Sequence, residues 1–231
     1  LLADLATLEK QKDKATRTAK AGRKEDQLIL KAIEKAYAHV DASQPIRTLA
    51  LAEGEQPVID DLHLITAKPV LYIANVGDQA DIDNERVKIV QAIAADEGAE
   101  AVALCAQIEA ELMQLDDDER DAFLQELEID EPGLHKVIRA AYHLLGLQTY
   151  FTAGPKEVRA WTVKVGATAP QAAAAIHTDF ERGFIRAEVV NFDDYVIAEG
   201  EHGAKESGKL RLEGKEYTVQ DGDVIHFRFN V

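Results

Sequence analysis

The sequence predicts an α/β protein in three parts: an antiparallel helical hairpin over residues 1–45, part of a parallel α/β domain over residues 46–146, and a β-grasp domain over residues 147–231. Three observations predict this fold. Apolar residues recur at helical spacing on both sides of a basic turn, apolar strands alternate with helices, and short glycine-punctuated strands surround one Ala-rich helix. With 231 residues, 46% of them hydrophobic, the chain can bury more than one core.

The hairpin is predicted from two amphipathic segments. Residues 1–22 carry leucines at positions 2, 5 and 8, and residues 25–40 repeat apolar side chains at helical spacing. The tip, residues 10–24, holds seven basic residues and one acid. From charge alone, a solvated helix end explains this tip as well as a patch that contacts RNA phosphates. The candidate RNA-contact residues are Lys12, Lys14, Arg17, Lys20, Arg23 and Lys24.

The second part alternates helices with apolar strands. The strands are expected over residues 69–75 and 100–105, and their lack of alternation is typical of parallel strands covered on both faces. The expected helices cover residues 58–66, 83–95, 106–115, 116–127 and 132–146. In the helix over residues 83–95, the apolar side that includes Val87, Ile93 and Ala94 is expected to be buried. This order predicts half of a doubly wound sheet.

The third part begins near Gly146, where short strands replace long helices. A half-buried strand is expected over residues 157–163 and one Ala-rich helix over residues 169–179, with short strands following to the end. One helix on a mixed sheet is a β-grasp arrangement. The string Gly203-Ala-Lys-Glu-Ser-Gly-Lys-Leu210 matches seven positions of a phosphate-binding P-loop, but Leu210 replaces the residue that would hold Mg²⁺. Because a strand pattern follows it, we interpret the string as a glycine-rich loop.

The bulk composition excludes several function classes. The formal net charge of −16 opposes non-specific electrostatic binding to nucleic acid, and we expect no DNA specificity. The apolar runs are too short to cross a bilayer and no leader pattern opens the chain, so we expect a cytoplasmic protein with no membrane partner. The only cysteine, Cys105, fits a reducing compartment and is better explained as a buried small hydrophobe than as a redox thiol.

The sequence predicts neither a metal site nor a catalytic residue. His135 and His143 lie too far apart on one helix to chelate a single ion. His177 is better explained by helix capping or packing than by catalysis. The acids that begin at Asp116 favour the start of a helix through its dipole and are interpreted as structural.

Three segments resemble one known family. They are Lys68-Pro-Val-Leu-Tyr-Ile-Ala-Asn-Val-Gly-Asp78, Ala174-Ala-Ile-His-Thr-Asp-Phe180 and residues 183–231. Together they resemble the YchF subfamily of Obg-related P-loop nucleotide hydrolases, across nearly the whole chain. The resemblance implies that residues 147–231 form a TGS domain and that residues 46–146 belong to a P-loop-type nucleotide-binding domain into which the hairpin is inserted. Because the chain begins within a helical pattern and contains no true P-loop, we expect the P-loop half to lie upstream in a longer protein.

The resemblance also implies a site for the nucleotide base. The family pattern Asn-x-x-Glu is met here by Asn75-Val-Gly-Asp78, and the Asp78 departure leaves the choice between ATP and GTP open. On this pattern Asn75 supports the loop, Val76 offers backbone polar groups, and Asp78 lies nearest the specificity edge of the base. Cys105 and Ala106 would form the second base-supporting loop. From the motif alone, an ordinary strand-to-helix turn explains Asn75-Val-Gly-Asp78 better.

The function implied by the resemblance is Mg²⁺-dependent hydrolysis of ATP, or of GTP, by the intact protein, coupled to the ribosome or to ribosomal RNA. This chain alone is expected to be inactive, because the P-loop that positions the γ-phosphate and Mg²⁺ is not in it. The competing prediction is a nucleotide-independent module that binds RNA or another protein.

Overall fold

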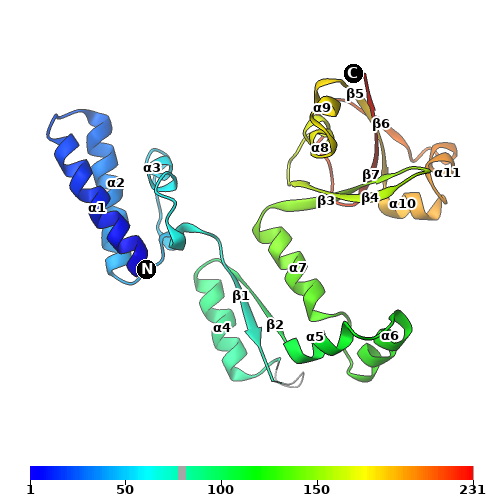
Figure 1. Cartoon of the computed structure of the whole chain (residues 1–231), viewed down its shortest axis with the longest axis horizontal. Coiled ribbons are helices and arrows are strands. Elements are labelled where there is room, and N and C mark those ends of the chain that lie inside the picture. Colours follow the sequence, from blue (N-terminus) through cyan, green and yellow to red (C-terminus); the bar gives the residue numbers. More distant parts are fainter. Residues whose placement is uncertain (78–81, 231) are drawn as a thin grey trace. The chain divides into compact units, whose positions relative to one another are not determined.

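The computed structural model describes residues 1–77 and 82–230 (Figure 1). They form two compact units, Leu1–Ala140 and Ala141–Val231. Both units mix helices with strands, so the predicted α/β class is confirmed. The finer division into three domains stays a prediction. Among the described helices, none combines the length and apolar character that a transmembrane span needs.

The first unit begins with a helical hairpin made of α1 (Leu2–Ala19) and α2 (Lys24–Asp41) (Figure 1). Gly22 lies between the helices with a φ of 77°, a conformation that costs little without a Cβ. The helices bury small and aliphatic side chains against each other and against the segment that follows. These are Leu8, Ala15, Ala32, Ile33, Ala36, Val40, Ile46, Ile59 and Leu64.

The connection from the hairpin to the sheet contains η1 (Ile46–Thr48), α3 (Gln56–Asp60) and η2 (Ile65–Ala67). The prediction of one helix over residues 58–66 is therefore wrong. A turn interrupts it, in which His63 has a φ of 49°. The N–H groups of Ile65 and Thr66 are then free to donate to Asp4 on α1, at 2.8 and 2.7 Å. Asp4 is only 3% exposed, so it links the hairpin to this connection from within.

The sheet of the first unit has two parallel strands, β1 (Leu71–Asn75) and β2 (Glu100–Leu104), separated in sequence by α4 (Glu85–Asp96). The strands and their parallel pairing agree with the sequence prediction, but their expected burial does not. Ile73 on β1 is 52% exposed, and Ile93, expected on the buried side of α4, is 46% exposed. Two strands and one helix do not supply the layers that cover both faces of a parallel sheet.

Three helices follow β2 in the chain: α5 (Ala106–Leu112), α6 (Asp117–Glu126) and α7 (Gly133–Leu144), the last of which begins in the first unit and ends in the second. Asp116 and Glu119 form a reciprocal capping box at the start of α6, which supports a structural role for the acids there. The carboxylate of Glu109 on α5 accepts hydrogen bonds from the N–H groups of Gly133 and Leu134, at 2.7 and 3.0 Å. This contact satisfies the start of α7 and attaches it to α5.

The second unit contains five strands: β3 (Leu147–Ala153), β4 (Val158–Lys164), β5 (Phe184–Asn191), β6 (Arg211–Glu213) and β7 (Asp223–Phe229). Their order in the sheet is β4-β3-β7-β5-β6, with β3 parallel to β7 and the other pairs antiparallel. The helix α8 (Ala169–Ile176) packs its alanines against the sheet, and Tyr150 Oη donates to the carbonyl oxygen of Ala172 at 2.8 Å. This is the predicted β-grasp arrangement.

Three short helices of the second unit differ from the sequence prediction. The helix expected over residues 169–179 breaks at His177, whose Nδ1 accepts from the N–H of Asp179 and caps α9 (Thr178–Arg182). The expected strands after β5 are preceded by α10 (Phe192–Ile197) and α11 (Glu201–Glu206). The glycine-rich loop expected at residues 203–210 is wrong for its first half, because Gly203 lies within α11 and a Cβ there would stand 2.0 Å from the carbonyl oxygen of Ala198, whereas residues 207–210 do form a turn and loop. Close packing, not loop flexibility, requires this glycine.

Candidate nucleotide-binding site

The two loops singled out by the sequence meet at the carboxyl ends of β1 and β2. Asn75 and Leu104 are register partners, and the N–H of Val76 donates to the carbonyl oxygen of Leu104 at 2.9 Å. Asn75 Oδ1 accepts a hydrogen bond from the N–H of Ala106 at 3.0 Å. Asn75 therefore joins the first loop to the second with its side chain. Asp78 lies outside the described residues.

The backbone groups that remain in these loops limit what they can do chemically. The N–H groups of Val76 and Ala106 are both bonded within the protein, and the carbonyl oxygen of Ala106, the first residue of α5, takes part in the helix, so among these groups only the carbonyl oxygen of Val76 can contact a base. Asn75 and Ala106 are exposed, whereas Val76 is half-buried. The surface near the two strand ends is accessible to a ligand, and the carbonyl oxygen of Val76 offers that ligand a hydrogen-bond acceptor.

Cys105 lies between the two strand-end loops and is 3% exposed. Its Sγ lies 3.7 Å from the carbonyl oxygen of Gly77, a weak thiol contact that joins the loops a second time. A buried thiol in this position matches the interpretation of Cys105 as a small hydrophobe.

A polar cluster around the carboxylate of Glu97 was not predicted from the sequence. Arg47 on η1 donates through Nε and Nη2 to Glu97 Oε2, at 2.9 and 2.7 Å, and Tyr72 Oη on β1 donates to the same oxygen at 3.0 Å. The hydrogen bond from Arg47 is the main reason why the pKa of Glu97 lies below its ordinary value. The cluster fixes β1 to the end of α4. No local pattern could have revealed it, because its members are distant in the sequence.

The basic hairpin tip spans the end of α1 and the start of α2. The ammonium group of Lys12 lies over the ring of Tyr37, 4.8 Å from its centroid, and Arg23 Nε pairs with Asp26 at 2.8 Å. These two candidates are thus engaged within the hairpin. The remaining candidates are exposed: Lys14, Arg17, Lys20 and Lys24.

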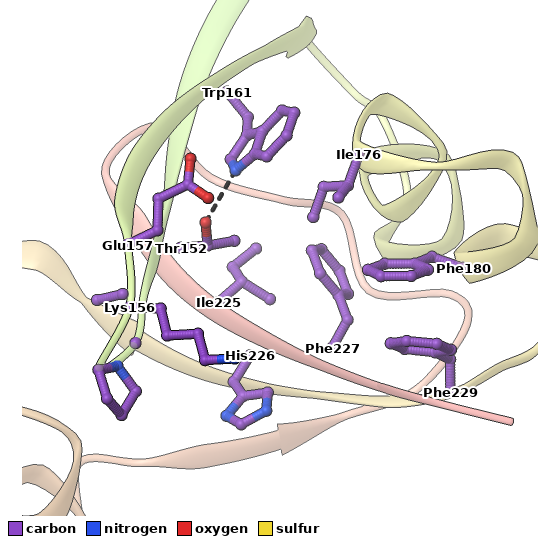
Figure 2. A pocket seen from close by; sticks show the side chains of 13 residues that line it. Thr152, Lys156, Glu157, Trp161, Ile176, Phe180, Ile225, His226, Phe227 and Phe229 are labelled. Carbon is purple, nitrogen blue, oxygen red and sulfur yellow. Dashed lines mark hydrogen bonds between the residues drawn. The ribbon is translucent and has the colours of Figure 1, made fainter.

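The second unit contains an aromatic groove with a volume of about 500 Å³, formed where β3, β4 and β7 meet α8 and α9 (Figure 2). The rings of Phe180 and Phe229 stack with centroids 3.7 Å apart. Trp161 Nε1 donates to Thr152 Oγ1 at 2.9 Å, and the Arg159 guanidinium lies 4.2 Å from the Trp161 ring centroid. These contacts fix the side chains that form the walls of the groove, so the fold of the second unit defines its shape.

Comparison with known proteins places these features in a family. Residues 147–230 match the family described as "YchF-GTPase_C: Protein of unknown function (DUF933)". The chain is 54% identical over 230 residues to the "Ribosome-binding ATPase YchF" of Haemophilus influenzae, a match that covers 100% of this chain and 63% of that protein. The chain belongs to the YchF family.

Two further YchF proteins support the same conclusion. The "Ribosome-binding ATPase YchF" of Bacillus subtilis is 49% identical over 234 residues, which covers 100% of this chain and 64% of that protein. The solved structure of the Schizosaccharomyces pombe YchF GTPase aligns with a TM-score of 0.81 at 30% identity, covering 98% of this chain and 62% of that one. The chain therefore spans less than two thirds of the length of these YchF relatives. None of them supports the competing prediction of a nucleotide-independent module.

Proposed function

We propose that this chain is the C-terminal part of a cytoplasmic YchF-type protein that binds and hydrolyses ATP or GTP with Mg²⁺ and associates with the ribosome. The observation that carries the proposal is the hydrogen bond between Asn75 and Ala106, because it unites the two loops to which the family pattern assigns the base. The names of the bacterial relatives, which describe ribosome-binding ATPases, support the nucleotide and the ribosome as partners. The β-grasp part would be the TGS domain.

The incomplete burial of the first unit's sheet supports a catalytic half outside this chain. Ile73 on β1 and both Ile89 and Ile93 on α4 are exposed apolar side chains, at positions that a parallel sheet normally covers. Further strands and helices would cover them in the longer protein. The P-loop and the Mg²⁺ ligands would lie there, so this chain by itself would bind nucleotide weakly and would not hydrolyse it.

The chemistry of the two loops favours adenine over guanine. With its N–H already bonded, Val76 can offer a base only its carbonyl acceptor, and the N–H of Ala106 is not available as a donor. Adenine presents an amino donor at the position where guanine presents a carbonyl acceptor. We expect the longer protein to bind Mg·ATP more tightly than Mg·GTP. Tighter binding of Mg·GTP would contradict this part of the proposal and would assign the base contact to the carboxylate of Asp78.

The role of Asn75 can be tested in the longer protein with an Asn75→Ala variant. Loss of the bond to Ala106 frees the second loop, and we expect ATP affinity to fall by about tenfold, equivalent to about 1.4 kcal/mol. Asn191→Ala is a matched control, because Asn191 Oδ1 accepts from the N–H of Asp193 at 3.0 Å in the second unit. Equal nucleotide affinities of the two variants in fluorescent-nucleotide titrations would show that the two loops do not form the base site.

Ribosome association is proposed to use the exposed cations of the hairpin tip. Changing Lys14, Arg17, Lys20 and Lys24 to Glu should strongly weaken cosedimentation with ribosomes and flatten the salt dependence of the binding that remains, because phosphate contacts release counterions. A control with the same charge change replaces four exposed lysines elsewhere: Lys68, Lys88, Lys205 and Lys215. If both variants lose cosedimentation equally, net charge and not the hairpin tip governs the interaction.

A further inference from the structure

Three potential metal ligands come together on one side of the β-grasp sheet. Glu188 lies on β5, His226 on β7, and Glu201 is the first residue of α11. One ligand atom from each lies within 4.8 Å of the others, and no other group of three His, Cys, Asp or Glu side chains comes together in this way in the part of the chain that the structure describes. Glu188 and His226 are register partners on neighbouring antiparallel strands, so the sheet itself holds two of the three ligands.

A small cavity lies at the same place. Its volume is about 10 Å³, and Glu188, Glu201 and His226 all line it. The rest of its lining is mainly apolar: Ala153, Val190, Tyr195, Leu210, Val224 and Ile225. A cavity of this size has room for about one water molecule or one ion. The three polar side chains therefore converge on a space of atomic size.

The contacts of Glu188 with arginine leave room for coordination. Arg228 donates through Nε to Oε1 at 3.2 Å and through Nη2 to Oε2 at 2.9 Å, and Arg186 lies 3.9 Å from Oε1. A carboxylate offers about four lone-pair positions, so a bidentate arginine occupies only some of them. Partners of this kind orient the carboxylates that bind metals in many proteins. The two arginines also offset the charges of Glu188 and Glu201, which disfavours ions that bind by charge alone.

We propose that Glu188, Glu201 and His226 bind one divalent transition-metal ion of the Zn²⁺ class. An imidazole nitrogen with two carboxylate oxygens suits Zn²⁺, whereas Mg²⁺ and Ca²⁺ prefer oxygen ligands alone. His226 Nδ1 and Glu201 Oε2 are 3.4 Å apart, which equals the separation of about 3.4 Å expected for two ligands of a tetrahedral zinc ion. A small shift of the Glu188 carboxylate that keeps its contact with Arg228 would bring it to the ion, and water would complete the coordination.

This ion is distinct from the Mg²⁺ of nucleotide hydrolysis and does not rest on the proposed function. Figure 2 shows His226 at the rim of the aromatic groove, on the strand that also carries Ile225 and Phe227. A metal bound there would connect α11 to β5 and β7. It would stabilise the second unit according to its concentration and affinity.

The test is a titration of the 231-residue chain with ZnCl₂, followed by calorimetry, and with CoCl₂, followed by the visible absorption of the bound ion. We expect one saturable site and a rise in the melting temperature of the second unit. His226→Asn and Glu201→Gln should each weaken Zn²⁺ binding by more than about tenfold. The matched controls are His202→Asn and Glu206→Gln, because His202 and Glu206 form a separate exposed pair within α11, 3.3 Å apart.

The site would be overturned by no saturable binding, by Zn²⁺ affinity that survives His226→Asn, or by equal losses in the control variants. Mg²⁺ binding as tight as that of Zn²⁺ would also overturn it, since it would indicate carboxylates alone. Glu188→Gln disturbs the contact with Arg228 and can unfold the sheet. The decision therefore rests on His226 and Glu201, whose side chains are 43% and 41% exposed and whose variants can be checked for folding by circular dichroism.

Discussion

The two units of the chain bury the same kind of strand residue to very different degrees. Ile225 on β7 is 1% exposed in a five-stranded sheet, whereas Ile73 on β1 is 52% exposed in a two-stranded one. Both are branched apolar residues within a strand. The β-grasp sheet closes its core with its own helices, and the parallel sheet does not. Apolar residues in a strand therefore predict that other elements bury that face of the sheet. Only the tertiary structure shows whether those elements belong to this chain.

The largest expected effect separates these two isoleucines. Ile225→Ala should lower the free energy of unfolding of the second unit by about 2–5 kcal/mol, because it leaves a cavity in a closed core. Ile73→Ala should change the stability of this chain by no more than about 0.5 kcal/mol. Urea denaturation followed by Trp161 fluorescence reports on the second unit, and hydrogen exchange at β1 reports on the first. Comparable losses would contradict the contrast. If Ile73→Ala lowers the free energy of unfolding of the longer protein as much as a core substitution does, Ile73 is buried there by elements outside this chain.

The next effect tests what stabilises the first unit in place of a closed sheet. Asp4→Asn removes one of the two acceptor oxygens that satisfy the N–H groups of Ile65 and Thr66, at a cost of about 1–3 kcal/mol. Asp13→Asn is the control, because Asp13 is an exposed acid on the same helix. Thermal unfolding of the hairpin should distinguish the two variants. If Asp4→Asn and Asp13→Asn have the same melting temperature, Asp4 does not anchor the hairpin.

The contribution of Asp4 should also depend on pH. Burial acts to raise its pKa, but the hydrogen bonds from Thr66 and Ile65 outweigh burial, and the folded-state pKa lies below the ordinary value. A lowered folded pKa means that the stabilisation is fully present above the unfolded pKa of about 3.9 and is lost as the pH falls through the folded pKa. Acid titration should therefore destabilise the hairpin less steeply in Asp4→Asn than in the original chain. Parallel titration curves would contradict this.

The smallest effect compares a similar contact in each unit. Tyr217 Oη donates to Asp223 at 2.7 Å, and Tyr72 Oη donates to Glu97 at 3.0 Å, and both carboxylates also face an arginine. Burial raises the pKa of Tyr217 to about 12, and the contact with Asp223 adds to the rise. Tyr217→Phe should cost about 1.5 kcal/mol and Tyr72→Phe about 0.5 kcal/mol, because Asp223 is the more deeply buried partner. Chemical denaturation measures both, and the reverse order would contradict the comparison.

Much of the fold could be predicted because its signals are local. The helical spacing that ends at Val40 and the unbroken apolar run before Asn75 each describe one element by itself. The helices α10 and α11 were missed for a different reason. Gly203 indicates a loop in isolation, yet in the structure it allows α11 to approach Ala198. His177 ends α8 because its side chain caps the next helix, a role that an alanine-rich pattern cannot reveal.

The candidate sites also divide into features with a local sequence signal and features that depend on tertiary contacts. The strand-end positions of Asn75 and Cys105 and the charge of the hairpin tip were visible in the sequence, because each depends on neighbours in the chain. By itself, the sequence determined the order of helices and strands, the residue types at the two loops, and the lack of a P-loop within these residues. Only the tertiary structure decided that Asn75 bonds to Ala106 and that Glu188, Glu201 and His226 converge. Hydrophobic periodicity and secondary-structure propensity depend on a few neighbouring residues. Burial and contacts between distant side chains depend instead on the register of the strands and on which helices pack against each sheet.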